Sequence, residues 1–173
     1  MLAPILTTAR LELYRPQAAD LAGVAAIVAP DAVRRFLGNR AVSMADEYAR
    51  FARNAGSWAL YGYGNFIVRE RGAEAVVGIC GVFHSWRGFG QGFDDVPEVG
   101  WIFAEPVWGR GYATEAAEAA LGWFDRTHGA RRVACMIEPG NHASLAVAAR
   151  LGFVRYGEQD FDGSAVILLQ RGA

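Results

Sequence analysis

Residues 98–121 combine amino-acid types that could bind an anion. Their sequence, EVGWIFAEPVWGRGYATEAAEAAL, indicates a strand, a short connection with two glycines, and a long helix. A helix that begins directly after glycines presents unpaired N–H groups and the positive end of its dipole, and both attract phosphate. Gly109 and Gly111 would let the backbone approach a phosphate closely, and Thr114 adds a hydroxyl. The pattern predicts a phosphate-binding turn, and the alternative is a purely structural turn.

Two common nucleotide-binding motifs do not fit this turn. All seventeen basic residues of the chain are arginines, so a Walker motif, which needs a lysine, is excluded. The dinucleotide motif G-x-G-x-x-G would require a glycine where Thr114 stands. Without lysine, Schiff-base chemistry on the protein and a lysine general base are excluded as well.

The elements that must position the turn alternate between strands and helices, as in an α/β protein. Asp20 is expected to cap one helix, and Ser43 with Asp46 resembles a capping box that opens the next. The periodicity predicts helices over 21–28, 43–61, 111–127 and 141–151. It predicts strands near 11–13 and over 65–70, 75–84, 98–103 and 132–137, a glycine-rich loop over 85–96, and a final hairpin from 153 to 170 that turns at Asp162-Gly163.

Composition limits the classes of protein that remain. With 173 residues and 53% hydrophobic residues, the chain can bury one sizeable core, and we expect a single domain over 1–173. A net charge of -1 without a basic cluster disfavours nucleic-acid binding. The longest apolar run, 75–83, is shorter than the ~18 residues of a membrane span, and no secretory signal is visible. We expect a cytoplasmic protein that does not bind membranes.

The two cysteines, Cys80 and Cys135, lie inside apolar runs. Such cysteines are usually buried free thiols, so we expect neither a disulfide nor a metal site from them.

Three stretches of the chain occur in the order and at the separation typical of one family. They are TARLEL at 8–13, EVGW at 98–101 with WGRGYATEA at 108–116, and NHAS at 141–144 with LGF at 151–153. The sequence resembles the GNAT superfamily of N-acetyltransferases, and within it the group of ribosomal-protein alanine N-acetyltransferases. Two positions depart from the general pattern. Trp108 replaces a Gln or Arg, and Ala148 replaces a tyrosine that acts as general acid in many members.

The resemblance implies a GNAT fold of the α+β type. In this fold a mixed, mostly antiparallel sheet is flanked by helices, and the two central strands, here 98–103 and 132–137, splay apart to admit the cofactor. The implied reaction transfers acetyl from acetyl-CoA to a primary amine, of a protein N-terminus or a small molecule, by direct attack in a ternary complex. The alternative is a non-catalytic acyl-CoA-binding sensor or interaction module, which Ala148 would suit. A homodimer is one candidate assembly.

The resemblance also assigns contacts with acetyl-CoA. The backbone over 101–103 would pair with the pantetheine arm, Arg110 would bind phosphate unless it is merely exposed, and Asn141 could instead cap a helix. The full set is Trp101, Ile102, Phe103, Trp108, Gly109, Arg110, Gly111, Tyr112, Ala113, Thr114, Asn141 and Ser144.

Acetyl transfer to an amine requires a proton acceptor, because alkylamines with a pKa near ~10 are mostly protonated at neutral pH. Glu98, at the start of its strand, is the candidate general base, although a salt-bridged carboxylate at a strand end is the alternative. Asp94 and Asp95 are further candidates, which could instead attract a cationic acceptor or stabilise the loop. Aromatic residues that could line the acceptor pocket, or simply pack, are Phe36, His84 and Trp86.

Overall fold

One sheet organises the residues that the computed structural model describes, which are 3–38, 43–90 and 92–172. Within these ranges eight strands pair in the order β1-β2-β3-β4-β5-β6-β8-β7. The strands are β1 (Leu6–Thr7), β2 (Leu11–Tyr14), β3 (Asn65–Glu70), β4 (Val76–Ser85), β5 (Val96–Phe103), β6 (Val133–Ile137), β7 (Val154–Phe161) and β8 (Ser164–Arg171). The helices are α1 (Leu21–Val28), α2 (Asp31–Arg34), α3 (Met44–Tyr61), α4 (Tyr112–His128) and α5 (His142–Arg150), with short 3-10 helices at Ala18–Asp20 and Glu105–Val107.

The centre of the sheet opens between β5 and β6. This pair is parallel, whereas the other neighbouring strands are antiparallel. Its register consists of one pair, Glu98 with Ala134, although β5 continues to Phe103 and β6 to Ile137. Because a regular parallel pair forms evenly spaced hydrogen bonds along its length, the two strands must diverge beyond Glu98. The mixed sheet with a central splay, which the sequence predicts, is confirmed.

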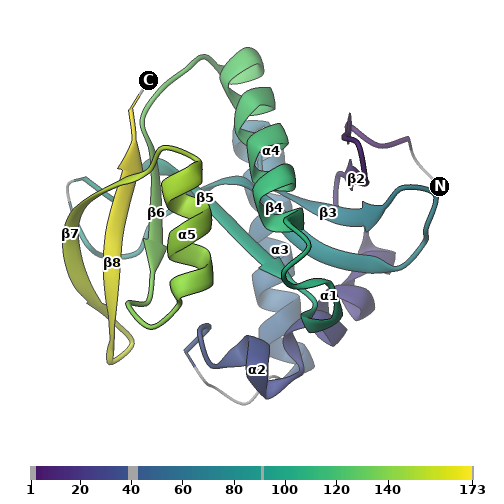
Figure 1. Ribbon diagram of the computed structural model, residues 1–173, viewed down its shortest axis with the longest axis horizontal. Coiled ribbons are helices and arrows are strands. Elements are labelled where there is room, and N and C mark those ends of the chain that lie inside the picture. Colours follow the sequence, from purple (N-terminus) through teal and green to yellow (C-terminus); the bar gives the residue numbers. More distant parts are fainter. Residues whose placement is uncertain (1–2, 39–42, 91, 173) are drawn as a thin grey trace.

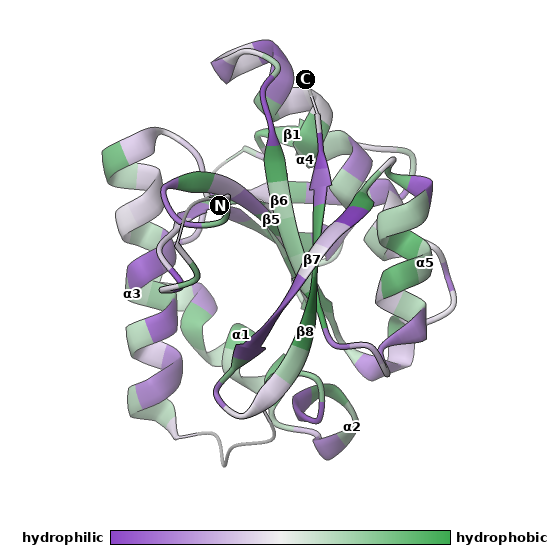
Figure 2. Ribbon diagram, turned by 90° about the vertical axis from the view of Figure 1, so that its left-hand side faces the viewer, coloured by the Kyte–Doolittle hydropathy of each residue, from purple (hydrophilic) through white to green (hydrophobic). Residues whose placement is uncertain are grey.

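Helices cover both faces of the sheet. Figure 1 shows α4 and α5 in front of the sheet and α3 behind it. Small residues of α4 such as Ala116 and Ala120 allow that helix to pack closely on Phe66 and Phe103. In Figure 2, strands β6 and β8 show hydrophobic colour in the middle of the molecule, between α3 and α5. The core therefore lies on the sheet and supports both strands of the splay.

Most predicted elements are confirmed, with end points that agree to within a few residues. Ser43 accepts a hydrogen bond from the N–H of Asp46 at 3.1 Å and begins α3, as the capping box predicts. Asp162 and Gly163 have φ values of 54° and 81°, which suit a two-residue hairpin turn between β7 and β8.

The predicted cap at Asp20 is wrong. Its backbone is helical, and its carboxylate accepts hydrogen bonds from the N–H of Gln17 at 2.8 Å and from Arg69 Nη2 at 2.6 Å. Arg69 is buried, and a buried charge requires a partner, so this ion pair determines the position of Asp20.

The two cysteines are free and buried, as the sequence predicts. Burial raises the pKa of both Cys80 and Cys135 far above the usual range. Among the described helices, none has the length and apolar character needed to cross a membrane.

Candidate active site

The predicted phosphate turn lies directly before α4 and beside the diverging end of β5. Gly109 and Gly111 have φ values of 74° and 79°, in the left-handed region that glycine adopts without strain. The indole N–H of Trp108 donates to the carbonyl of Phe103 at 2.8 Å and ties the turn to the end of β5. A Cβ atom added at Gly109 would meet no heavy atom within 4 Å. The turn therefore leaves open space next to the N-terminus of a long helix.

The N-terminal segment holds this turn in place. The carboxylate of Glu115, in the first turn of α4, accepts hydrogen bonds from Thr8 Oγ1 at 2.6 Å, from the N–H of Arg10 at 3.0 Å and from Arg10 Nε at 2.7 Å. Arg10 also donates to the carbonyl of Arg110 at 2.7 Å. Burial opposes the charge of Glu115, but the contacts with Thr8 and Arg10 outweigh it and lower the pKa of this carboxyl. Two of the stretches that carry the family resemblance thus contact each other here.

The side chains of the turn are partly engaged within the protein. Arg110 forms an ion pair with Glu70 at 3.2 Å, and the hydroxyl of the buried Tyr112 donates to the same carboxylate at 2.6 Å. The N–H groups at the start of an α-helix, in contrast, have no partner inside the helix. The hydrogen-bond donors that the turn leaves available to a phosphate are therefore its backbone N–H groups. Phosphate binding by Arg110 stays a prediction.

The second predicted cofactor motif lies at the start of α5. Asn141 caps this helix, because its Oδ1 accepts the N–H of Ser144 at 3.1 Å. Ser144 Oγ accepts the indole N–H of Trp101 at 3.2 Å, which links β5 to the helix that follows β6. One turn further along α5, Ala148 is buried and offers no hydroxyl. Both predicted motifs thus lie next to the splayed strands.

Glu98 is buried, with 3% of its surface exposed, and it is tightly paired. Ser85 Oγ donates to Glu98 Oε2 at 2.6 Å, Arg87 Nε donates to the same oxygen at 2.9 Å, and Arg87 Nη2 donates to Oε1 at 2.8 Å. Ser85 and Arg87 were not predicted from the sequence as partners of Glu98. The antiparallel register could have indicated Ser85, because Phe83 lies opposite Glu98 and Ser85 opposite Val96, so that Ser85 and Glu98 are diagonal neighbours.

The other two candidate carboxylates stabilise the loop between β4 and β5. Asp94 accepts hydrogen bonds from the N–H groups of Arg87, Gly88, Phe89 and Gly90 at 2.8 to 3.4 Å. These contacts, that of Gly90 foremost, hold the pKa of Asp94 below its usual value. This arrangement matches the loop-stabilising alternative. Gln91, within the predicted loop, lies outside the described residues.

Asp95 has a partner of its own, since its Oδ1 lies 2.9 Å from His84 Nε2. The other ring nitrogen of His84 lies 2.9 Å from the hydroxyl of Tyr63. Burial raises the pKa of Tyr63. Each member of the predicted acidic cluster, Asp94, Asp95 and Glu98, therefore has a hydrogen-bond donor beside it.

The three candidate acceptor residues do not gather around Glu98. Phe83 lies opposite Glu98 and shares its face of the sheet, so the next residue, His84, points to the other face. Trp86 has 69% of its surface exposed. Phe36 lies near the second motif, because a Cβ atom at Gly140 would be 3.8 Å from its Cε1. Of the three, Phe36 is thus placed beside predicted cofactor residues.

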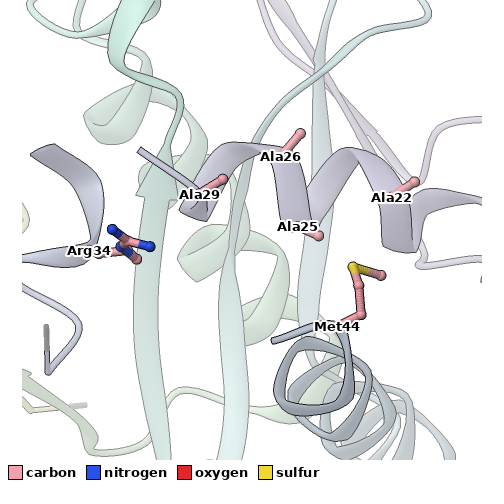
Figure 3. A pocket seen from close by; sticks show the side chains of 6 residues that line it. All are labelled: Ala22, Ala25, Ala26, Ala29, Arg34 and Met44. Atoms are coloured by element: carbon pink, nitrogen blue, oxygen red, sulfur yellow. The ribbon is translucent and has the colours of Figure 1, made fainter. Parts of the chain in front are cut away.

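A separate hollow of about 390 Å³ lies beside α1 (Figure 3). The figure shows four alanines along α1, with Arg34 of α2 and Met44 of α3 on neighbouring segments. Residues that line it are Ala22, Ala25, Ala26, Ala29, Arg34 and Met44. It includes neither the turn nor Glu98, so it does not contribute to the candidate active site.

Known proteins resemble this chain over most of its length. Residues 10–154 match the family model of the acetyltransferase (GNAT) domain. A solved structure from Bordetella pertussis, assigned to the GNAT acetyltransferases, is 35% identical with a TM-score of 0.87, over 96% of this chain and 98% of that one. RimL, a ribosomal L7/L12 alpha-N-protein acetyltransferase solved in complex with coenzyme A, shares the fold, with a TM-score of 0.73 and 16% identity over 97% of each chain.

A curated relative matches a shorter part of the sequence. The uncharacterized protein YkkB of Bacillus subtilis (strain 168) is 36% identical over 96 residues, which are 53% of this chain. The match spans about half of that relative, 51% of its length.

Proposed function

Because the chain belongs to the acetyltransferase (GNAT) family, we propose that it transfers acetyl from acetyl-CoA to a primary amine. The acceptor is the amine of a protein N-terminus or of a small molecule, and it attacks the thioester directly in a ternary complex. The observation that carries this proposal is the open glycine turn at the N-terminus of α4, directly beside the splayed end of β5. Direct attack is supported by the burial of both cysteines, which makes an acyl-cysteine intermediate unfavourable.

The residues present fit acetyl-CoA. The N–H groups over 109–114 can bind the pyrophosphate, because they lie at a helix N-terminus in a turn that leaves open space. The edge of β5 over 101–103 diverges from β6 and can pair with the amides of the pantetheine arm. RimL, which has the same fold, has been solved with coenzyme A bound. Use of this co-substrate and the two free thiols support the cytoplasmic location expected from the sequence.

We also propose that the chain forms one acetyltransferase domain. The apolar cluster around Phe66 and the cluster around Phe124 share Trp101, Trp123 and Leu151 as packing partners. Both sides of the splay therefore rest on one continuous core, as a single domain requires.

The reaction forms an N–C bond and breaks the C–S bond of the thioester. An acceptor that arrives as an ammonium ion must first lose a proton, and Glu98 is the proposed acceptor of this proton, directly or through water. The amine nitrogen then attacks the carbonyl carbon, whose oxygen can receive hydrogen bonds from N–H groups of β5. The thiolate that leaves needs little assistance, since a free thiol has a pKa of only ~8.5. It takes up, directly or through water, the second proton that the nitrogen loses as the amide forms, and so gives the free thiol of CoA.

Two observations favour a second candidate, a non-catalytic acyl-CoA sensor. Ala148 offers no acid to the leaving thiolate, and Glu98 is already paired with Arg87 and Ser85. A sensor would bind acetyl-CoA through the same turn but would release no free thiol in the presence of amines.

One assay distinguishes the two candidates. Free thiol is measured while the protein is incubated with acetyl-CoA and a panel of peptides with free N-termini, polyamines and amino sugars, and CoA binding is measured by calorimetry. We expect binding, and thiol release that depends on one class of amine. Glu98→Gln should keep CoA affinity while the rate falls by ~10²- to 10⁴-fold, as expected on loss of a general base. Binding without turnover for any amine would favour the sensor, and no binding would refute both.

A further inference from the structure

Arg87, a half-buried residue of the loop after β4, is in direct contact with the candidate general base. Its guanidinium donates from two nitrogens to the two oxygens of Glu98, at 2.8 and 2.9 Å. This is the bidentate arrangement in which arginine recognises a carboxylate most strongly and in a defined orientation. The partner carboxylate is buried, whereas the Arg87 side chain keeps 25% of its surface exposed.

The arginine is itself held on three sides. Asp94 accepts its backbone N–H at 2.8 Å and so fixes where the side chain leaves the loop. The guanidinium carbon lies 5.9 Å from the centre of the Phe83 ring and 5.4 Å from that of Phe161, within the range of cation–π contacts. The loop, β4 and β7 therefore all determine the position of this one side chain.

These contacts leave part of the carboxylate available. Among the described residues, Oε2 of Glu98 accepts hydrogen bonds from Ser85 and Arg87, whereas Oε1 accepts one, from Arg87. An ionised carboxylate has about four acceptor positions on its two oxygens. We infer that Arg87 is a positioning residue for acetyl transfer: it orients Glu98 so that Oε1 can accept a hydrogen bond and then a proton from the acceptor amine. This inference rests on the proposed function.

In the described part of the chain, the other titratable groups that interact with Glu98 are neutral at neutral pH. Electrostatic interactions connect it with Cys135 and Tyr156. Burial and the nearby Glu98 raise the pKa of Cys135, and burial raises the pKa of Tyr156 even though Arg132 opposes this, so both stay protonated at neutral pH. Ser85 contributes a neutral hydroxyl. Arg87 is thus the cation in direct contact with the carboxylate, and its removal would leave the orientation of Glu98 to Ser85 alone.

The test compares Arg87→Met and Arg87→Lys with a control, Arg171→Met. The Arg171 side chain is about as exposed as that of Arg87, at 22%, and forms an ion pair with the more exposed Asp125, but Arg171 lies at the end of β8. We expect Arg87→Met to keep its CoA affinity and to lose up to about 100-fold in kcat/KM for the amine identified in the panel, since misplaced catalytic groups cost about this much. Arg87→Lys should recover part of the loss, and so should methylguanidine added to Arg87→Met. The control should behave like the wild type.

The division of the loss between kcat and KM separates positioning from a merely structural role. In Arg87→Met the loss should fall on kcat, while the KM for the amine stays near its wild-type value, because the interaction is needed in the transition state. A folded Arg87→Met protein with wild-type kcat/KM would overturn the inference, and so would a loss confined to KM. So would a loss that neither lysine nor methylguanidine reduces. Wild-type protein that acetylates no amine would instead overturn the proposed function, and this inference with it.

Discussion

Substitution of Gly109 by alanine provides a sharp test of the phosphate turn. The structure supplies a matched control, Gly72, in the hairpin between β3 and β4. The two glycines have φ values of 74° and 73°, and a Cβ atom at either would meet no heavy atom within 4 Å. An alanine in the left-handed region costs about 1–2 kcal/mol. Both variants should therefore lose similar stability, which corresponds to about 2–8 °C in Tm for a chain of this size.

Only Gly109→Ala should affect CoA binding, because the added methyl group would occupy the space proposed for the pyrophosphate. An extra methyl group in a filled site costs about 1–3 kcal/mol, or roughly tenfold or more in Kd. At a CoA concentration of 100 times the wild-type Kd, the stabilisation by ligand should be about 2.7 kcal/mol for the wild type and Gly72→Ala. For Gly109→Ala it should be about 1.4 kcal/mol or less.

Thermal unfolding with and without CoA measures these differences, and calorimetric titration gives Kd directly. If Gly109→Ala bound CoA as tightly as Gly72→Ala, the turn would only connect β5 to α4, and the cofactor assignment of residues 108–114 would be refuted.

Three further outcomes follow from the contacts described above. The pKa of Glu115 is lowered in the folded protein, so its contacts stabilise the fold fully above the ordinary pKa of 4.5, and this stabilisation is lost as the pH falls below that value. Arg10→Met should therefore reduce the pH dependence of the free energy of unfolding, measured by denaturant titration. An unchanged pH dependence would contradict the role of Arg10. Asp94→Asn should speed hydrogen exchange of the amides of residues 87–90 while that of β3 stays constant, because the loop loses charged acceptors; equal exchange in both proteins would show that the loop does not depend on them. The raised pKa values of Cys80 and Cys135 predict that neither thiol reacts measurably with thiol reagents at pH 8 until the protein unfolds. Rapid labelling of either cysteine in the folded protein would refute the burial of these thiols.

Local sequence patterns predicted those elements whose structure depends on residues that are neighbours in the sequence. The strand over 65–70 agrees residue by residue, because a short run of one aromatic and two β-branched residues, 66–68, is followed closely by a glycine turn. Strand β1 and helix α2 were not predicted, since they are too short to display a period. Asp20 was misread as a cap because its actual partner, Arg69, is 49 positions away in the chain.

In the candidate site too, the local feature was predicted from the sequence and the long-range contacts were not. The glycine turn was visible from the positions of Gly109 and Gly111, because the backbone conformation itself requires glycine there. The partners of the charged residues were not visible. Glu98 contacts Arg87 across a loop, and Glu115 contacts Arg10 at a separation of 105 residues, so only the strand register and the packing of α4 on β2 bring them together.

The single residue pair between β5 and β6 has a consequence for how the molecule opens. The ladders from β1 to β5 and those among β6, β8 and β7 are continuous, but one pair joins the two groups. Each group should therefore open as a separate cooperative unit with its own free energy, coupled to the other through side chains such as Trp101. A co-substrate whose amides bridged both strand edges would replace the missing ladder. Its binding would slow the opening of both units together.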